Sequence, residues 1–283
     1  MTDYLVYDVF SAKAFGGNQL AVIPDATALP ESDLQKIARE FNFSETTFVY
    51  PPEDAHNQAK VRIFTPTMEI PFAGHPVVGT AVALADLGVC ADDGNMVLEL
   101  GVGPLPCHAA NGSARFTTEV PLDVIATPDV AQVAAALGLS VDDIKVDAHV
   151  PTLASVGLPF TITELHSREA LARITTDVSG FRAGAAQYPT SLDFAQFAYF
   201  REGQTLHARM FAPLDNIPED PATGSACAAL GALLSKVEGA DQQLLIRQGE
   251  DMGRLSLIDL TTQGAAVTIS GAAKRVMQGT FVY

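Results

Sequence analysis

The chain has 283 residues, of which 48% are hydrophobic and 18% are charged, which is enough to build full cores in one or two domains. Its formal net charge of −16 at pH 7 makes nucleic acid a poor partner, because phosphate binding requires clustered Lys and Arg. No apolar run reaches the roughly 18 residues of a membrane span, so no membrane partner is expected. The N-terminus has no basic segment or cleavage site, so no signal peptide is predicted.

Three cysteines, Cys90, Cys107 and Cys227, stand far apart and form no C-x-x-C motif. This pattern argues against a disulfide scaffold and a structural zinc site, and it favours a reducing compartment, so we expect the cytoplasm. The histidines show no metal-ligand spacing, and no glycine-rich phosphate loop follows a predicted strand. We therefore expect neither a metal nor a nucleotide cofactor.

The first part of the chain contains short apolar runs bounded by Gly, Pro and Asn, which are typical of β-strands. The predicted strands cover residues 5–10, 19–25, 46–51, 60–66 and 95–103. Residues 31–43 predict an amphipathic helix, since Leu34, Ile37, Ala38 and Phe41 recur on one face.

The stretch around residues 118–130 is interrupted by prolines and has no strong periodicity, which suits a domain junction. A helix is predicted over residues 130–138. A second series of strands follows at 151–157, 159–165, 193–200 and 205–213, and two strand-like segments with turns cover 242–260 and 265–283.

The chain contains an internal repeat. The segment RIFTPTMEIP (62–71) aligns with RMFAPLDNIP (209–218), sharing Arg, Phe, Pro, Ile and Pro. After a shift of two residues, HPVVGTA (75–81) aligns with DPATGSA (220–226). Each copy then enters a predicted helix that is apolar on all sides, and such a helix must be buried on every face.

The repeat predicts an α+β fold with two pseudo-symmetric domains, each a curled, mostly antiparallel, barrel-like β-sheet around a central apolar helix. We place the first domain at residues 1–118 and the second at 119–275, with a strand at about 276–283 returning to the first. Domain interfaces are favoured ligand positions, so we expect an active site in the cleft between the two domains.

Both predicted helices begin with an ionisable residue, a proline and small residues. His75 and Asp220 precede the prolines, at the position that normally caps a helix and that suits Asp better than His. Small residues such as Gly224 leave backbone N–H groups open to an anion. The pattern predicts that both helix starts bind one ligand; the alternatives are that Asp220 is only a cap and that Ser225 bonds to its own helix.

Two further residues complete the candidate set. Glu45 lies among Phe and Val residues, and an apolar setting would raise its pKa toward neutrality and suit it to proton transfer; the alternative is a capping box. Asn18 follows two glycines in a predicted turn, where it either meets a ligand or closes the turn. Cys227 is interpreted as a small hydrophobic residue, and the role of Arg254, in a predicted glycine hairpin, stays open.

Five segments of the chain occur in an order that matches a known family. They are FGGNQLAVI, SET around Glu45, RIFTPTMEIPFAGHPVVGTA, EDPATGSA and QGEDMGR. In these segments, and over nearly its whole length, the chain resembles the phenazine-biosynthesis PhzF family. That family is similar in fold to diaminopimelate epimerase. The resemblance implies a homodimeric, cofactor-free isomerase of a carboxylate such as trans-2,3-dihydro-3-hydroxyanthranilate. It implies Glu45 as general acid and base, with Gly74, His75, Asp220 and Ser225 holding the substrate and assisting proton movement.

Two alternatives stay open at this point. One is an epimerase or racemase of an amino or hydroxy acid in which Cys227 takes part. The related epimerases use two catalytic cysteines, one from each half, and the repeat alignment offers none at those positions, which disfavours this hypothesis. The other is a binding protein that kept the fold and lost turnover. Gln19 stands where the family usually has proline, and we expect only a small effect on the stiffness of the turn.

Overall fold

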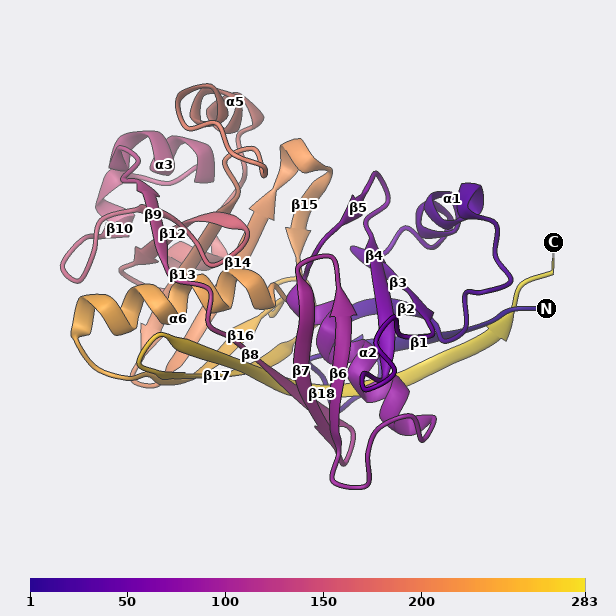
Figure 1. Cartoon of the computed structure of the whole chain (residues 1–283). Helices are drawn as coiled ribbons and strands as arrows, with labels where there is room; N and C mark the ends of the chain where they lie inside the picture. Colours follow the sequence, from indigo (N-terminus) through magenta and orange to yellow (C-terminus); the bar gives the residue numbers. More distant parts are fainter. Residues whose placement is uncertain (283) are drawn as a thin grey trace. The chain divides into compact units, whose positions relative to one another are not determined.

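The computed structural model describes residues 1–282, and the chain divides into two compact units (Figure 1). Unit 1 comprises Met1–Thr117 and Ile269–Tyr283, and unit 2 comprises Thr118–Thr268. The chain therefore returns to unit 1 at Ile269, earlier than the predicted residue 276, because a single strand, β18 (Ala266–Thr280), runs through this region. Tyr283, the last residue of the predicted returning strand, lies outside the described residues.

Unit 1 is a β-sheet that closes on itself. Its strands, in their order around the sheet, are β18, β1 (Asp3–Val9), β2 (Asn18–Ile23), β3 (Glu45–Tyr50), β4 (Ala59–Phe64), β6 (Asn95–Leu100), β7 (Gly103–Ala110) and β8 (Ser113–Thr118), and β8 pairs with β18. The pairs β2–β3 and β4–β6 are parallel, and the pairs β1–β18, β1–β2, β3–β4, β6–β7 and β7–β8 are antiparallel. The short strand β5 (Glu69–Ile70) adds to β4.

The apolar helix α2 (Gly74–Asp86) packs against β1, β2, β3 and β7, and all of its residues from Gly74 to Leu84 are buried. The helix approaches the strands closely at Gly79, where a Cβ atom would lie 2.6 Å from side-chain atoms of both Leu20 and Val9. The predicted fold class, a curled sheet around an apolar helix, is therefore confirmed. The physical reason is that a helix without a polar face has to be buried on all sides.

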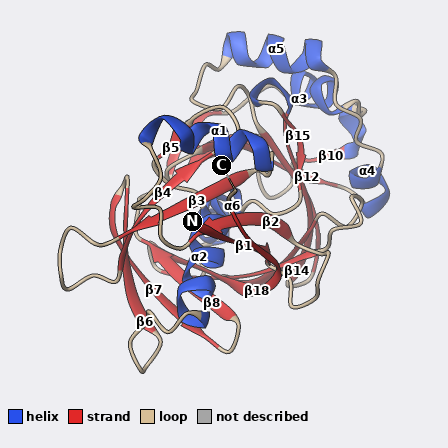
Figure 2. Cartoon of the chain, turned by 90° about the vertical axis from the view of Figure 1, so that its right-hand side faces the viewer, coloured by secondary structure: helices blue, strands red, loops and turns tan. Residues whose placement is uncertain are grey.

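Helix α1 (Glu31–Phe41) packs on a different part of unit 1, against β3 and β4 (Figures 1 and 2). Its buried face carries Leu34, Ile37 and Ala38, as the sequence predicts, and these residues share a core cluster with Phe48 and Phe64. The helix ends two residues earlier than predicted, because Asn42 adopts a left-handed conformation with φ of 52° and caps it.

Unit 2 has a similar order of strands and a similar apolar helix. Its strands pair in the order β9 (Asp123–Ala126), β11 (Thr152–Ser155), β12 (Pro159–Leu165), β13 (Gln196–Glu202), β14 (Thr205–Ala212), β16 (Gln243–Gln248) and β17 (Ser256–Gln263). The pairs β12–β13 and β14–β16 are parallel, like their counterparts in unit 1. Helix α6 (Gly224–Glu238) contacts β11, β12 and β17, and it is the counterpart of α2.

Smaller elements complete unit 2. They are β10 (Ile144–Lys145) and β15 (Ile217–Asp220), the 3-10 helices η1 (Val141–Asp143) and η2 (Pro213–Asp215), and the helices α3 (Val130–Leu137), α4 (Arg168–Ala172) and α5 (Val178–Gln187). The stretch 118–130, predicted as a domain junction, begins at the boundary between the two units and contains β9, which pairs with β11. Helix α5 was not predicted, because its sequence VSGFRAGAAQ shows only a weak apolar face.

The strand register corrects the predicted alignment of the two halves. In unit 1, Ile63 of β4 pairs with Ile70, whereas in unit 2 the equivalent Met210 of β14 pairs with Asp220. The counterpart of Asp220 is therefore Ile70 and not His75. The connection is longer in unit 2, where η2 occupies it, and an alignment by residue identity does not detect this insertion.

The two apolar helices give the same correction. Helix α2 begins at Gly74 and helix α6 at Gly224, so His75 and Ser225 are both the second residue of their helices. The prediction that His75 takes the capping position is wrong, since the helix begins one residue before it and Ala73 is the N-cap. Asp220 lies at the end of β15, several residues before α6.

Candidate functional site

Glu45 and His75 lie together in unit 1. Glu45 is the first residue of β3, and its Oε2 atom is 3.2 Å from Nδ1 of His75. The His75 side chain is only 3% exposed and the Glu45 side chain 13%, so the contact is largely shielded from water. Asn18, the first residue of β2, places its Nδ2 atom 3.4 Å from the same Nδ1. Two predicted site residues, Glu45 and Asn18, thus converge on one imidazole nitrogen of a third, His75.

Burial lowers the pKa of His75 from 6.5 to about 3, and a hydrogen bond with the backbone of Gln19 opposes this shift only in part. His75 is therefore a neutral imidazole near pH 7, and its contact with Glu45 is not an ion pair. A neutral ring nitrogen either donates to a carboxylate or accepts from a protonated carboxyl group, depending on the tautomer. Burial thus places an uncharged ring nitrogen beside the Glu45 carboxyl group.

We expect the His75 imidazole to stay neutral between pH 5 and pH 8, because charging it would require burying a positive charge. The unfolded chain binds this proton near pH 6.5, so His75 reduces the stability of unit 1 as the pH falls from about 6.5 toward 3. Imidazole ¹⁵N chemical shifts measured against pH would test this, with the urea-unfolded protein as the reference that titrates normally. A protonated His75 in the folded protein at pH 6 would contradict the prediction.

A hydrogen bond between two threonine side chains connects strand β3, which carries Glu45, to helix α2, which carries His75. The hydroxyl groups of Thr47 and Thr80 are 2.9 Å apart, and both residues are fully buried. Thr80 therefore bonds across to the sheet, instead of only to its own helix as such residues usually do. This bond fixes the strand that carries Glu45 against the helix that carries His75.

The turn before Asn18 is held rigidly. Gly17 has φ of 64°, and a Cβ atom there would lie 2.2 Å from the carbonyl oxygen of Val9, so only glycine fits. Earlier in the turn, the Phe15 N–H donates to the buried carboxylate of Asp8 at 2.6 Å. Ser44, next to Glu45 in the chain, donates to Oδ1 of Asn18 at 3.4 Å. Asn18, which follows the turn as the first residue of β2, thus has a defined orientation.

Of the other predicted site residues, Gly74 begins α2 in unit 1, next to His75 in the chain, and the remaining three belong to unit 2. Asp220 is 5% exposed, and one of its carboxylate oxygens accepts a hydrogen bond from the hydroxyl of Thr223. Gly224 and Ser225 form the first turn of α6, and Ser225 is 7% exposed. Because the first N–H groups of a helix have no partner within it, this end of the 15-residue helix α6 suits an anion such as a carboxylate.

Three polar residues around Asp220 were not singled out from the sequence. Thr223 is the N-cap residue of α6, Gln248 ends β16 and Ser256 begins β17. Gln248 lies in the segment QGEDMGR, for which the sequence predicts a glycine hairpin. The available signal was a glutamine at a position of β16 where the strand pattern calls for an apolar residue, since Leu244 and Ile246 precede it at spacings of two.

Cys227 is completely buried in α6, and burial raises the pKa of its thiol far above the usual range. It therefore behaves as a small hydrophobic residue, as interpreted from the sequence. Arg254 follows the turn after Gly249, and its backbone N–H donates to the Gly249 carbonyl at 3.0 Å. These observations assign no chemical role to either side chain.

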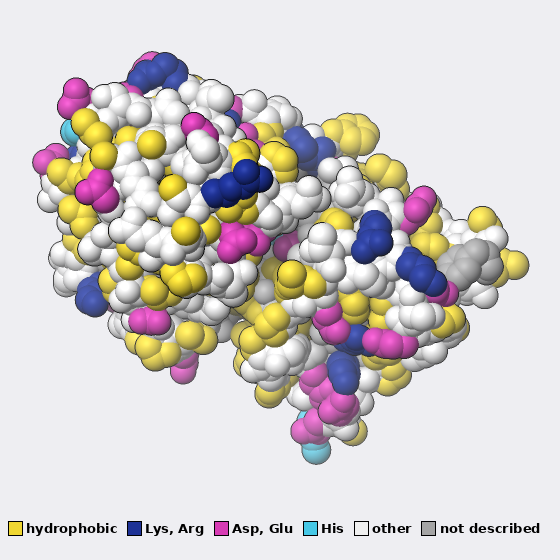
Figure 3. Space-filling model, turned by 90° about the horizontal axis from the view of Figure 1, so that it is seen from above, with side chains coloured by type: hydrophobic (Ala, Val, Ile, Leu, Met, Phe, Trp, Pro, Cys, Tyr) yellow, Lys and Arg dark blue, Asp and Glu magenta, His cyan; other side chains and the backbone are white. Residues whose placement is uncertain are grey.

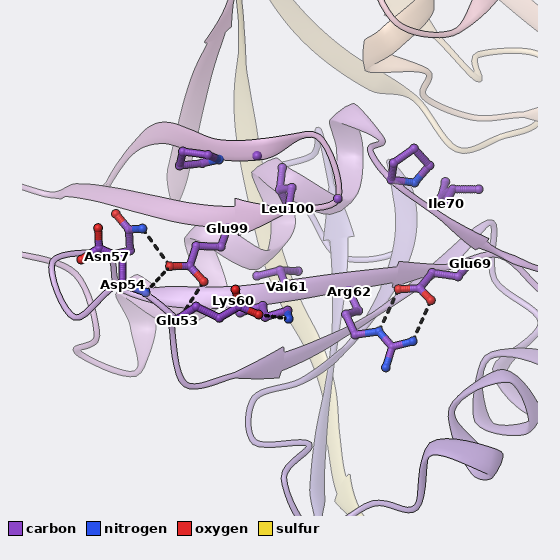
Figure 4. Close-up of a pocket in the computed structure, with 14 residues that line it drawn as sticks. Glu53, Asp54, Asn57, Lys60, Val61, Arg62, Glu69, Ile70, Glu99 and Leu100 are labelled. Carbon is purple, nitrogen blue, oxygen red and sulfur yellow. Dashed lines mark hydrogen bonds and ion pairs between the residues drawn. The ribbon is translucent and has the colours of Figure 1, made fainter.

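A separate groove of about 830 Å³ lies between β4, β5 and the β6–β7 turn of unit 1 (Figure 4). Its polar lining forms pairs within itself, such as Arg62 with Glu69 and Lys60 with Glu53. None of the predicted site residues lines this groove. Its position therefore does not support a role as the catalytic pocket.

Lys and Arg side chains stand apart on the face shown in Figure 3 and form no basic patch there. Within residues 1–282, no helix is long and apolar enough to cross a membrane. Over the same residues, no group of three or more His, Cys, Asp or Glu side chains is arranged to hold a metal ion.

Comparisons with known proteins agree with this architecture. The PhzC-PhzF family model, described as phenazine biosynthesis-like protein, matches residues 7–279. An uncharacterized isomerase of Mesorhizobium japonicum is 38% identical over 294 residues, with 98% of this chain and 97% of that protein covered. The trans-2,3-dihydro-3-hydroxyanthranilate isomerase of Pseudomonas fluorescens is 34% identical, with 100% of both covered. A crystal structure of a PhzF-family protein from Bacillus anthracis superposes with a TM-score of 0.87 at 24% identity, covering 100% of this chain and 99% of that one.

Proposed function

Because this chain belongs to the PhzC-PhzF family and is an isomerase, we propose that it moves a proton between two carbon atoms of a small carboxylate, with Glu45 as the general acid and base. The observation that carries this proposal is the buried contact of 3.2 Å between Glu45 and the neutral His75. A carboxyl group beside an uncharged ring nitrogen is suited to hold a proton and to release it.

In the proposed step the Glu45 carboxylate removes a proton from one carbon, and the C–H electron pair enters the π-system of the substrate. The double bond shifts, and Glu45 returns the proton to a second carbon. Electrons and atoms balance within the substrate and one carboxyl group, so the step needs no oxidant. The uncharged His75 ring lies beside Glu45 during the step, with Nδ1 3.2 Å from Oε2, and Asn18 Nδ2 lies 3.4 Å from the same ring nitrogen.

Unit 2 would hold the substrate. The N-terminal turn of α6, with Gly224 and Ser225, suits the substrate carboxylate, and Asp220 would meet the polar groups of the ring. The proposal assigns the proton-transfer groups to unit 1 and the anchoring of the substrate to unit 2. A homodimer, expected from the family resemblance, stays a prediction.

The proposed substrate class follows the relatives. The protein from Pseudomonas fluorescens, and similar ones from two other Pseudomonas species, are named trans-2,3-dihydro-3-hydroxyanthranilate isomerases. Their identity to this chain, 33–34%, supports a substrate of similar chemistry: a small ring or diene that carries a carboxylate. No observation favours the epimerase alternative, since the inaccessible Cys227 thiol cannot serve as a base.

Turnover in D₂O would test this proposal. We expect the chain to isomerise trans-2,3-dihydro-3-hydroxyanthranilate and to introduce deuterium at the carbon that receives the proton, because a carboxyl proton exchanges with solvent between turnovers. ¹H NMR would follow both events. Absence of turnover would contradict the substrate assignment, and turnover without any deuterium would contradict a proton carrier that exchanges with water.

A further inference from the structure

A chain of hydrogen bonds leads to the carboxylate of Asp220 within unit 2. The Gln248 side chain is fully buried, and its Oε1 atom accepts the backbone N–H of Thr223 at 3.0 Å. Its Nε2 atom donates to the backbone carbonyl of Asp220 at 2.7 Å and to Oγ1 of Thr223 at 2.9 Å. The Thr223 hydroxyl then donates to Oδ2 of Asp220.

The direction of each bond in this chain is determined. A backbone N–H can only donate and a carbonyl can only accept, so the Gln248 amide has one possible orientation. Both of its N–H groups are then used, and one of them occupies a lone pair of the Thr223 hydroxyl. Thr223 has a single hydroxyl hydrogen, and it is directed at Asp220. The carboxylate is therefore held by an ordered donor whose own position is set by Gln248.

Unit 1 provides an internal comparison, because the same backbone positions exist there. In unit 2, Asp220 ends β15 and Thr223 is the N-cap of α6. Gln248 ends β16, and Ser256 begins β17. The corresponding positions of unit 1, at β5, α2, β6 and β7, hold Ile70, Ala73, Leu100 and Gly103. Unit 1 thus forms the same fold without any of these polar groups. Thr223, Gln248 and Ser256 accompany Asp220 in unit 2, and none of the four has a polar counterpart in unit 1.

We propose that Thr223 and Gln248 are positioning residues for Asp220, and that they orient its carboxylate toward the substrate during proton transfer. Ser256 supports the same loop, since its hydroxyl donates to the carbonyl of Pro221 at 2.6 Å. The inference rests on the proposed function, which places Asp220 in the substrate site. A chain of buried, fully satisfied hydrogen bonds is costly to disturb, which makes it suited to fixing one conformation.

Two variants test this proposal: Thr223→Val, which is isosteric but lacks the hydroxyl, and Thr223→Ser, which keeps the hydroxyl. Thr223→Val is expected to lower kcat by about 10- to 100-fold with little change in KM, because the Asp220 carboxylate loses its hydroxyl donor. Thr223→Ser is expected to retain most of the activity, because it keeps this hydroxyl. In an Asp220→Asn background, Thr223→Val should add no further loss, since its effect passes through the carboxylate. An equal effect in both backgrounds would overturn the proposal.

A second variant and matched controls separate positioning from stability. Gln248→Met should reproduce the loss in kcat. The controls are Thr262→Val and Gln242→Met, which alter a buried threonine and glutamine that bond near the other end of α6 and should leave kcat unchanged. If these controls lower kcat as much as Thr223→Val, the role is structural and the proposal fails.

A structural measurement keeps this inference distinct from the proposed function. If the wild-type chain does not isomerise trans-2,3-dihydro-3-hydroxyanthranilate, the proposed function fails on its own. Crystal structures of the Thr223 variants then decide the positioning role. The Asp220 carboxylate is expected to rotate away in Thr223→Val and to keep its place in Thr223→Ser. An Asp220 side chain that is unmoved in Thr223→Val would overturn the inference.

Discussion

The Glu45→Gln variant is expected to lose isomerase turnover by about 100- to 10,000-fold, the usual contribution of a general acid or base. Glutamine matches glutamate in size and fits beside His75, but its amide neither accepts nor releases a proton near neutral pH. Incorporation of solvent deuterium should disappear together with turnover. Substrate binding should be largely retained, because the proposed carboxylate anchor lies in unit 2.

Glu53→Gln is the matched control for this prediction. Glu53 belongs to the same unit, but its side chain is 75% exposed and pairs with Lys60 in the groove of Figure 4. The same chemical change there should leave deuterium exchange and turnover at wild-type levels. Calorimetric binding of the substrate to Glu45→Gln would separate a lost proton carrier from a lost binding site. Exchange retained in Glu45→Gln would assign the proton step to another group.

The second large effect is expected at Arg209. Its guanidinium binds Glu219 through two hydrogen bonds of 2.8 Å, and its Nη1 atom donates to the carbonyl of Leu171 at 3.0 Å, within α4. Arg209 is only 8% exposed. Arg209→Met would leave the Glu219 carboxylate and a helix carbonyl without this partner, so we expect unit 2 to lose about 3 kcal/mol of stability.

Arg62 is the counterpart of Arg209 and serves as its control. It binds Glu69 with the same two-bond geometry and lies 5.1 Å from the centre of the Phe64 ring, as Arg209 lies 4.8 Å from that of Phe211. Its partners, however, are exposed to solvent. Arg62→Met should therefore cost unit 1 only about 1 kcal/mol. Urea unfolding with peptide-resolved hydrogen exchange would measure the stability of each unit separately. Equal losses of stability in Arg209→Met and Arg62→Met would show that burial does not determine how much each Arg–Glu pair contributes.

The architecture was predictable from a few sequence features. The segments after residues 74 and 224 carry almost no polar side chains, and a helix of that kind is stable in a water-soluble fold only when a sheet encloses it. The strand-rich pattern supplied such a sheet, and the repeat indicated that it occurs twice. Boundaries were less predictable, because β9, β7 and β8 pair in the sheet without strong periodicity of their own.

The pairing of equivalent residues could not be obtained from identity alone. Matching prolines aligned His75 with Asp220, whereas hydrogen-bond register aligns Asp220 with Ile70 and His75 with Ser225. A short insertion in a turn changes the sequence spacing without changing the sheet. Only the ladder of backbone hydrogen bonds shows which residues occupy the same place.

By itself, the sequence determined the fold class, the family and the set of ionisable residues, because burial patterns and short motifs are local properties of the chain. The tertiary structure decided which groups act on one another. His75 becomes a neutral ring against Glu45 because the closed sheet removes it from water. Asp220 gains Gln248 as a support because β14 pairs in parallel with β16, which brings together residues that are far apart in the chain. Contacts of this kind depend on register and burial, which no local pattern contains.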